Sequence, residues 1–171
     1  VMQTQKHPYF VAAHYYAGFI YFSQHMLQQA LSAFEVALGA SEYNAVLPYY
    51  IAEIYYEQGE KDQALAYGDS VLSAGAVNYY EKDLQLLVGQ IYFEKQVYDK
   101  ALPFIESFVT KSGKVTREVM YELSFCYYKG GKTDKAIAGF RQLSNEKDSL
   151  GQSSMYLLGT LYLNIGDKPN A

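Results

Sequence analysis

The chain has 171 residues, of which 50% are hydrophobic, 16% aromatic and 19% charged, and its formal net charge is −4. An acidic chain with few charges lacks the basic stripe that neutralises phosphates, so we expect no nucleic-acid partner. No apolar run approaches the ~20 residues that a membrane-spanning helix needs, so we expect no direct membrane insertion. A single cysteine, Cys126, excludes an internal disulfide framework.

A short pattern recurs five times along the chain, with a small residue followed three positions later by a tyrosine. The small residues are Gly18, Ala52, Gly89, Ser124 and Gly159, at separations of 34, 37, 35 and 35 positions. The tyrosines are Tyr21, Tyr55, Tyr92, Tyr127 and Tyr162. An alanine follows each small residue by twelve positions, as Ala30, Ala64, Ala101, Ala136 and Ala171. A period of this size indicates one supersecondary unit stacked on copies of itself.

Apolar spacings of three and four residues predict two helices in each repeat. In chain order, the expected helices span residues 9–22, 26–38, 45–58, 61–73, 80–95, 98–111, 117–128, 133–143 and 153–164. Short turns at residues 23–25, Gly59 and Gly130-Gly131 separate the helices within a unit, and we expect Gly39 to end a helix in a left-handed conformation. The predicted fold class is therefore all-α.

The repeats divide the chain as one array. We expect repeats at residues 11–44, 45–81, 82–116 and 117–151, and the first helix of a fifth repeat at residues 152–171. Residues 1–8 are expected to be the end of a preceding repeat, because Pro8 disfavours a helical conformation in the residue before it.

The columns resemble the tetratricopeptide repeat. That family's signature is Leu-Gly-x-x-Tyr in the first helix, a glycine at the turn, and then alanine, an aromatic residue and a second small residue. The first repeat matches it with Ala17, Gly18, Tyr21, Ala30, Phe34 and Ala37, and the fourth with Leu123, Ser124, Tyr127, Gly131, Ala136 and Phe140. Gly68 and Phe108 depart from it. The resemblance implies a right-handed superhelical solenoid of antiparallel helix-turn-helix units that binds a protein or peptide.

Residues that could support catalysis are scattered. His7, His14 and His25 have no cysteine or carboxylate cluster at ligand spacing, and no histidine is placed to activate Cys126. Gly130-Gly131-Lys132-Thr133 lacks the earlier glycine of a phosphate-binding loop, since Cys126 occupies that position. We therefore expect no catalytic site, no metal and no cofactor.

In the family that the chain resembles, the first helices line a concave groove. Offsets of four and three residues place one set of side chains on a single face of each first helix. The candidate groove residues are Tyr15, Phe19, Phe22, Tyr49, Glu53, Tyr56, Glu57, Gln90, Phe93, Glu94, Tyr121, Phe125, Tyr128 and Tyr156. Two interpretations of this stripe stay open: its aromatic residues contact a ligand, or they pack against neighbouring first helices.

The groove composition restricts the partner. None of the first-helix positions that clamp a peptide carboxylate in related proteins is lysine or asparagine here, so we expect a different ligand. An extended or helical segment with apolar anchors would fit, with a basic residue to meet Glu53, Glu57 or Glu94. The alternatives are a structural spacer, a homodimer formed through exposed terminal repeat faces, or a regulatory module of a larger protein. Similar arrays in bacterial envelope-assembly proteins favour an envelope or periplasmic location over the cytoplasm.

Overall fold

The computed structural model describes residues 8–166, and this part of the chain folds into nine α-helices, one short 3₁₀ turn and no strand. The helices are α1 (Pro8–Ser23), α2 (Leu27–Ala37), α3 (Leu47–Glu57), α4 (Lys61–Ala74), α5 (Glu81–Glu94), α6 (Tyr98–Lys111), α7 (Arg117–Lys129), α8 (Thr133–Leu143) and α9 (Ser149–Asn164). The 3₁₀ turn η1 (Ser41–Tyr43) connects α2 to α3.

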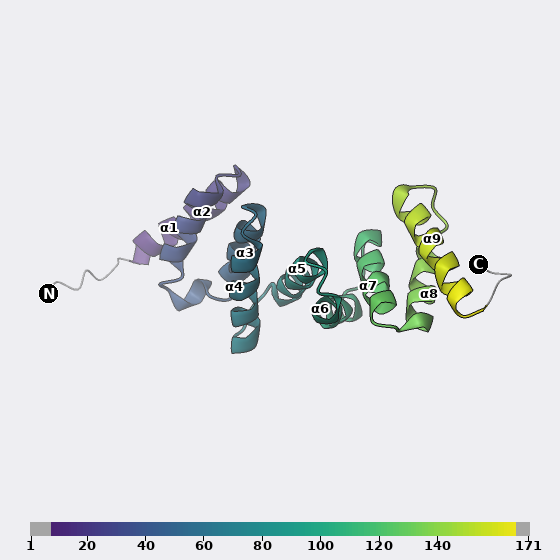
Figure 1. Cartoon of the computed structure of the whole chain (residues 1–171). Coiled ribbons are helices and arrows are strands. Elements are labelled where there is room, and N and C mark those ends of the chain that lie inside the picture. Colours follow the sequence, from purple (N-terminus) through teal and green to yellow (C-terminus); the bar gives the residue numbers. More distant parts are fainter. Residues whose placement is uncertain (1–7, 167–171) are drawn as a thin grey trace. The chain divides into compact units, whose positions relative to one another are not determined.

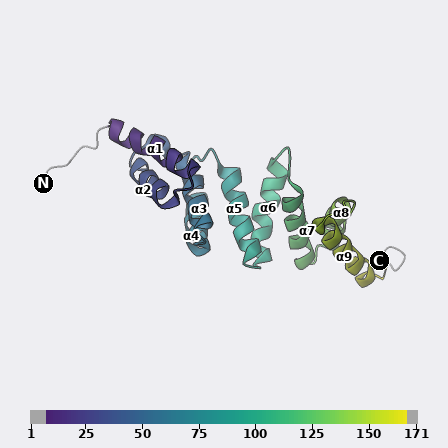
Figure 2. The same cartoon turned by 90° about the horizontal axis from the view of Figure 1, so that it is seen from above.

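The chain divides into two compact units, Val1–Leu84 and Gln85–Ala171. In the first unit, α1 packs against α2, α2 against α3, and α3 against α4 (Figure 1). In the second unit, α6 packs against α7, α7 against α8, and α8 against α9; Figure 2 shows α6 beside α7. Within each unit these helices pack on their neighbours in the sequence, and the prediction of an all-α array of helix-turn-helix repeats is confirmed.

The turn inside each repeat has the same backbone geometry in all five copies. The seventh residue after the small residue has a positive φ of 57–81°, and these residues are His25, Gly59, Gln96, Gly131 and Gly166. In four of these turns the next amide donates a 2.9 Å hydrogen bond to the carbonyl of the repeat tyrosine, as in Met26 to Tyr21 and Lys132 to Tyr127. This six-to-one bond is the Schellman arrangement that ends helices at a left-handed residue.

The small residues lie where the two helices of a repeat approach each other most closely. A Cβ atom added to Gly18 would lie 2.5 Å from the Phe34 ring, and one added to Gly89 would lie 2.8 Å from Ile105. In the fourth repeat the small residue is Ser124, and the glycine lies on the facing second helix. A Cβ added to Gly139 would lie 1.9 Å from the Ser124 hydroxyl. The predicted role of the small column in close helix packing is therefore confirmed at these contacts.

Each unit contains its own apolar core. In the first unit the core joins α2 and α3 through Ala30, Leu31, Phe34, Ala37, Leu47, Ile51 and Ile54. In the second unit it joins α6, α7, α8 and α9 through Ala101, Ile105, Val119, Leu123, Cys126, Tyr127, Ala136, Phe140 and Leu161. The alanine column of the repeat contributes to both sets. Of the tyrosine column, Tyr127 lies in the second core, whereas Tyr21 and Tyr55 are partly buried and pack against the first.

Three local details differ from the expectations. Gly39 does not have a positive φ, because α2 ends through Leu38 in a right-handed conformation and continues into turn hydrogen bonds. The last helix begins at Ser149 rather than Ser153, because the Asp148 carboxylate caps it by accepting from the Gly151 amide at 2.7 Å. Pro8 is the first residue of α1, where its missing N–H costs little. The predicted end of a preceding repeat otherwise lies in residues 1–7, outside the described residues.

Between residues 8 and 166, every helix falls short of the length and apolar character required to cross a membrane.

Candidate functional site

An open hollow of about 410 Å³ lies between α7 and α9 in the second unit, and these two helices contact each other. Its lining residues are Tyr121, Phe125, Gln152, Ser153, Tyr156 and Leu157. We call this hollow the α7–α9 groove. It brings together three of the predicted groove residues, Tyr121, Phe125 and Tyr156, from two first helices of consecutive repeats.

The groove has a fixed floor and an exposed rim. The Tyr121 and Phe125 rings are half-buried and stacked on each other at 6.0 Å, and Tyr121 also contacts Phe140 of the core at 5.8 Å. Tyr156 is 75% exposed, and no ring contact or side-chain hydrogen bond to other described residues holds it. An aromatic side chain that is exposed beside fixed rings offers a large contact area to a ligand.

The remaining predicted aromatic residues of the second unit pack against Phe125. The Phe125 ring is 5.7 Å from Phe93, 5.3 Å from Tyr98 and 5.9 Å from Tyr128. The Lys129 ammonium lies 5.4 Å from the Phe125 ring centre, a distance at which a cation–π interaction forms. Phe93 and Tyr128 therefore pack against the Phe125 ring in the floor of the groove.

The predicted aromatic residues of the first unit pack on one another. Tyr15 stacks on Tyr43 at 4.2 Å, and Phe19 contacts Phe34 at 4.9 Å and Tyr50 at 4.8 Å. Phe22 also contacts Tyr50, while Tyr49 stacks on Tyr80 at 5.6 Å. Tyr56 is half-buried and lies under the Lys61 ammonium at 6.0 Å. These rings form a continuous packed surface, so much of their area already contacts protein.

Half-buried carboxylates accompany the aromatic residues in both units. Burial raises the pKa of Glu53, and the neighbouring Glu57 and Asp83 carboxylates raise it further, although the Tyr49 hydroxyl donates to it. Burial likewise raises the pKa of Glu122, and Glu94 and Glu118 add to that effect. Glu122 accepts hydrogen bonds from the Gln90 amide at 3.1 and 3.2 Å. A cationic group supplied by a ligand would relieve this accumulation of negative charge.

Among residues 8–166, neither Glu53 nor Glu122 forms an ion pair with a lysine or arginine of the chain. Glu57, which is exposed at the end of α3, lies 3.4 Å from the ring of His25. Glu94 is exposed at the end of α5. The predicted acidic residues thus lie beside the aromatic ones in each unit.

Several groove-lining or ring-packing residues were missed by reasoning from the sequence. They are Tyr43, Tyr50 and Tyr80 in the first unit and Gln152, Ser153 and Leu157 in the second. Gln152 could have been found, because it precedes Tyr156 by four residues and lies on the same helical face. The early start of α9, which brings residues 149–152 into the helix, hid this relation.

The residues considered for catalysis lie in the core or in a turn between helices. Cys126 is 1% exposed, and burial, assisted by Glu122, raises the pKa of its thiol to about 12. Gly130-Gly131-Lys132-Thr133 forms the turn between α7 and α8, where the Lys132 ammonium lies 5.6 Å from the Tyr127 ring centre. Within the described part of the chain, no three metal-binding side chains gather into a group.

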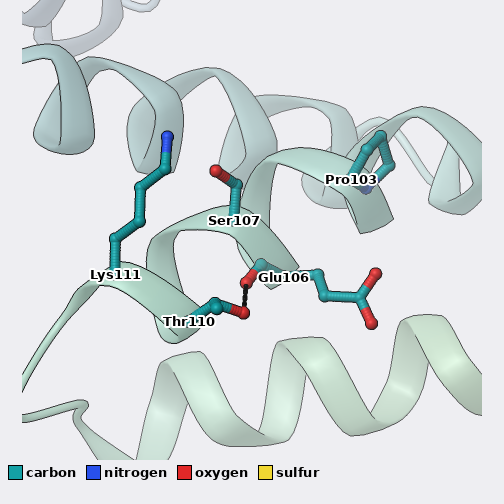
Figure 3. Close-up of a pocket in the computed structure, with 5 residues that line it drawn as sticks. All are labelled: Pro103, Glu106, Ser107, Thr110 and Lys111. Atoms are coloured by element: carbon teal, nitrogen blue, oxygen red, sulfur yellow. Dashed lines mark hydrogen bonds between the residues drawn. The ribbon is translucent and has the colours of Figure 1, made fainter.

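A second hollow, of about 320 Å³, lies on α6 and is lined by Pro103, Glu106, Ser107, Thr110 and Lys111 (Figure 3). Its polar groups already have partners. Ser107 and Lys111 both bond to the Gln85 side chain, at 3.1 and 3.5 Å. Glu106 points away from them and accepts from the Tyr127 hydroxyl at 2.6 Å and the Lys135 ammonium at 2.9 Å. This hollow is therefore part of the network between helices rather than a ligand site.

Solved structures with the same fold are tetratricopeptide-repeat proteins and the protein MamA. YrrB, described as a TPR protein with an unusual peptide-binding site, matches with a TM-score of 0.74 at 20% identity, over 92% of this chain and 78% of its own. MamA from AMB-1 matches with a TM-score of 0.74 at 17% identity, over 94% of this chain and 85% of its own. A tetratricopeptide repeat protein from Parabacteroides merdae ATCC 43184 matches with a TM-score of 0.70 at 18% identity, over 92% and 62% of the two chains.

No curated protein matches the sequence significantly. The sequence profile of the tetratricopeptide repeat matches residues 46–72 and 118–147, which contain α3 with α4 and α7 with α8. The matched segments, the repeat columns and the shared fold show that the chain contains tetratricopeptide repeats.

Proposed function

We propose that the α7–α9 groove binds a peptide segment of a partner protein. Tetratricopeptide repeats are protein-interaction modules, and the proposal gives that general role a place in this chain. The observation that carries it is the position of Tyr156, which is 75% exposed at the rim of a hollow whose floor is made of the half-buried Tyr121 and Phe125. The peptide-binding site named for the similar protein YrrB supports the same kind of role.

The ligand that fits the groove is an extended or helical segment with one apolar anchor. The anchor side chain lies between the Tyr121 and Phe125 rings and Tyr156, while Gln152 and Ser153 hydrogen-bond to its backbone or polar flanks. A basic residue in the ligand would be attracted to Glu122, which follows Tyr121 directly on α7. A ring with few rotatable bonds gives contact area at a low entropic cost, which favours tyrosine at such a rim.

Selection from a random peptide library on the immobilised chain tests this proposal. We expect the selected peptides to share an aromatic or aliphatic anchor and to lose at least about tenfold in affinity for Tyr156→Ser, which corresponds to ~1.4 kcal/mol. Tyr79→Ser is the matched control, because Tyr79 is 74% exposed, belongs to the first unit and is not one of the residues that line the groove. Equal binding to wild type and Tyr156→Ser would place the selected site elsewhere.

A second candidate function is self-association through the terminal helices. Ile20 on α1 and Met155 and Leu163 on α9 are exposed apolar side chains, and neither helix contains a charged residue apart from His14. Such faces favour contact with another protein surface. Light scattering across a concentration series tests this role, which predicts a dimer that dissociates in the Ile20→Glu or Leu163→Glu variant.

A further inference from the structure

Arg117 is the first residue of α7, and its guanidinium group binds both ends of the connection between α8 and α9. Nη2 donates to the carbonyl of Leu143, the last residue of α8, at 3.2 Å, and to Oδ1 of Asp148 at 3.2 Å. Nη1 donates to Oδ2 of Asp148, the residue directly before α9. A forked contact of this kind fixes orientation as well as distance, because two N–H groups must face one carboxylate.

The connection itself, residues 144–148, is folded tightly against the first turn of α9. Oδ1 of Asp148 also accepts from the Gly151 amide at 2.7 Å, so one carboxylate both pairs with Arg117 and caps the helix. The Arg117 guanidinium lowers the pKa of Asp148 below its ordinary value, and the Gly151 amide adds to that effect. A Cβ atom added to Gly151 would lie 1.9 Å from the Glu146 carbonyl oxygen. The start of α9 is therefore fixed relative to the start of α7.

Both walls of the α7–α9 groove begin at this contact. On each helix, groove residues follow Arg117 or Asp148 by four and by eight positions, which places them on the same helical face as the contact. These residues are Tyr121 and Phe125 on α7, and Gln152 and Tyr156 on α9. The position of the first half of α9 relative to α7 therefore sets the space between the aromatic floor and the exposed rim.

The arginine is specific to the repeat that supplies the groove floor. It lies seven residues before the small residue of its repeat, and the other repeats have Val11, Ala45, Lys82 and Gln152 at that position. None of these side chains has the planar fork of donors with which a guanidinium group binds a carboxylate and a carbonyl together.

We propose that Arg117 is a positioning residue for peptide binding at the α7–α9 groove, which it prepares by holding the first half of α9 at a fixed distance from α7. The inference rests on the proposed function, because the groove is the site whose geometry Arg117 controls. Arg117 is not one of the residues that line the groove, so it acts through α9. A wall that is already in place need not be ordered when the peptide binds, and this raises the affinity.

The probe is a fluorescein-labelled peptide selected on the wild-type chain, and fluorescence anisotropy measures its affinity for the full chain. We expect Arg117→Gln and Asp148→Asn each to bind it about fivefold more weakly than wild type. Asparagine still caps a helix, so Asp148→Asn separates the ion pair from the cap. The double variant should bind about as weakly as either single variant, because both substitutions remove the same contact.

The matched control is Lys135→Gln, which breaks the 2.9 Å ion pair between Lys135 and Glu106 in the same unit without changing a residue of the groove. It should bind the peptide as wild type does. Both ion pairs are partly exposed to solvent and contribute little to stability, so the melting temperatures of all these variants should stay near that of wild type. A loss of affinity confined to the Arg117 and Asp148 variants therefore reports the position of α9.

Hydrogen exchange of the Gly151 amide, followed by NMR on the free chain, needs no peptide. Arg117→Gln should raise its exchange rate about fivefold, and Lys135→Gln should leave it unchanged. The inference is overturned by equal peptide affinity in wild type and Arg117→Gln, by an equal loss in Lys135→Gln, or by additive losses in the double variant. If the peptide binds Tyr156→Ser as well as wild type, the proposed function fails instead. The Gly151 exchange rate then decides whether Arg117 holds α9, and an unchanged rate shows that it does not.

Discussion

The repeat tyrosines use both their rings and their hydroxyl groups. Tyr127 is buried in the core, and its hydroxyl donates to Glu106 at 2.6 Å while Lys135 donates to the same carboxylate oxygen at 2.9 Å. One residue on α7 thereby joins α6 and α8. Tyr162 of the next repeat bonds to Arg141 of α8 in a similar way. These two repeat tyrosines thus link neighbouring helices through polar contacts as well as through their rings.

Removing the Tyr127 hydroxyl should destabilise the second unit. We expect Tyr127→Phe to lower the free energy of unfolding by about 1 kcal/mol, because a hydrogen bond to a carboxylate is lost while the ring keeps its packing. Urea denaturation measures the change. Tyr128→Phe is the control, since the Tyr128 ring packs on Phe125 but no hydrogen bond of its hydroxyl to the described residues is present, and it should leave stability unchanged.

Two glutamates should show opposite pH dependence. The folded-state pKa of Glu122 is raised, mainly by burial, so its protonated form is favoured and its contribution to stability falls as pH rises above its unfolded value of about 4.3. The melting temperature of Glu122→Gln should therefore rise relative to that of wild type as the pH increases from 4 to 7. The pKa of Glu106 is lowered, chiefly by the Tyr127 hydrogen bond and then by Lys135. Glu106→Gln should be less stable than wild type above pH ~4.3, and this difference should shrink as the pH falls below that value. A stability difference from wild type that does not change with pH in either variant would contradict this assignment.

At the scale of the helix pair, close approach requires a small residue, which is a glycine in the first repeat. Gly18→Ala should destabilise the first unit by about 1–3 kcal/mol, because the new Cβ would lie 2.5 Å from a ring that is itself buried. Gly113→Ala is the matched control, since a Cβ there would meet nothing within 4 Å and the residue does not have a positive φ. Thermal unfolding of the two variants should differ clearly, and equal melting temperatures would mean that the α1–α2 contact tolerates the methyl group.

A substitution in one of the turns should stabilise the folded chain. Gln96 has a φ of 61° at a position where three of the other repeats place glycine. A non-glycine residue is strained there, so Gln96→Gly should stabilise the chain by about 0.5–1 kcal/mol. Gly131→Ala, at the equivalent turn with a φ of 69°, should destabilise it by a similar amount. A destabilised Gln96→Gly would show that the unfolded-state entropy of glycine outweighs the relief of strain.

The sequence predicts the helix pairs, their turns and the close contacts well, because all of these depend on columns that recur from repeat to repeat. It predicts the groove less completely. Offsets of three and four residues correctly grouped Tyr121 with Phe125, yet they could not show that Phe93 and Tyr98 would pack on Phe125 or that Tyr50 would contact Phe19 and Phe22. Those contacts join different helices, and a helical pattern identifies a face without identifying what lies against it. Tyr156 differs because no neighbouring ring reaches it.

At the scale of the whole molecule, each of the two compact units has its own core, and the α7–α9 groove belongs to the second unit. Changes in exposed residues of the first unit should therefore leave peptide binding at the groove unchanged, because all residues that line the groove come from the second unit. The low charge of the chain fits surfaces that recognise apolar groups on other proteins.

The most direct test of the proposed function is NMR chemical-shift mapping of a selected peptide on the ¹⁵N-labelled full chain. We predict that the largest changes fall on α7 and α9, at and around Tyr121, Phe125, Gln152 and Tyr156, and that they disappear in Tyr156→Ser. Changes confined to α6 and α8, or to the first unit, would contradict the assignment of the peptide site to the α7–α9 groove.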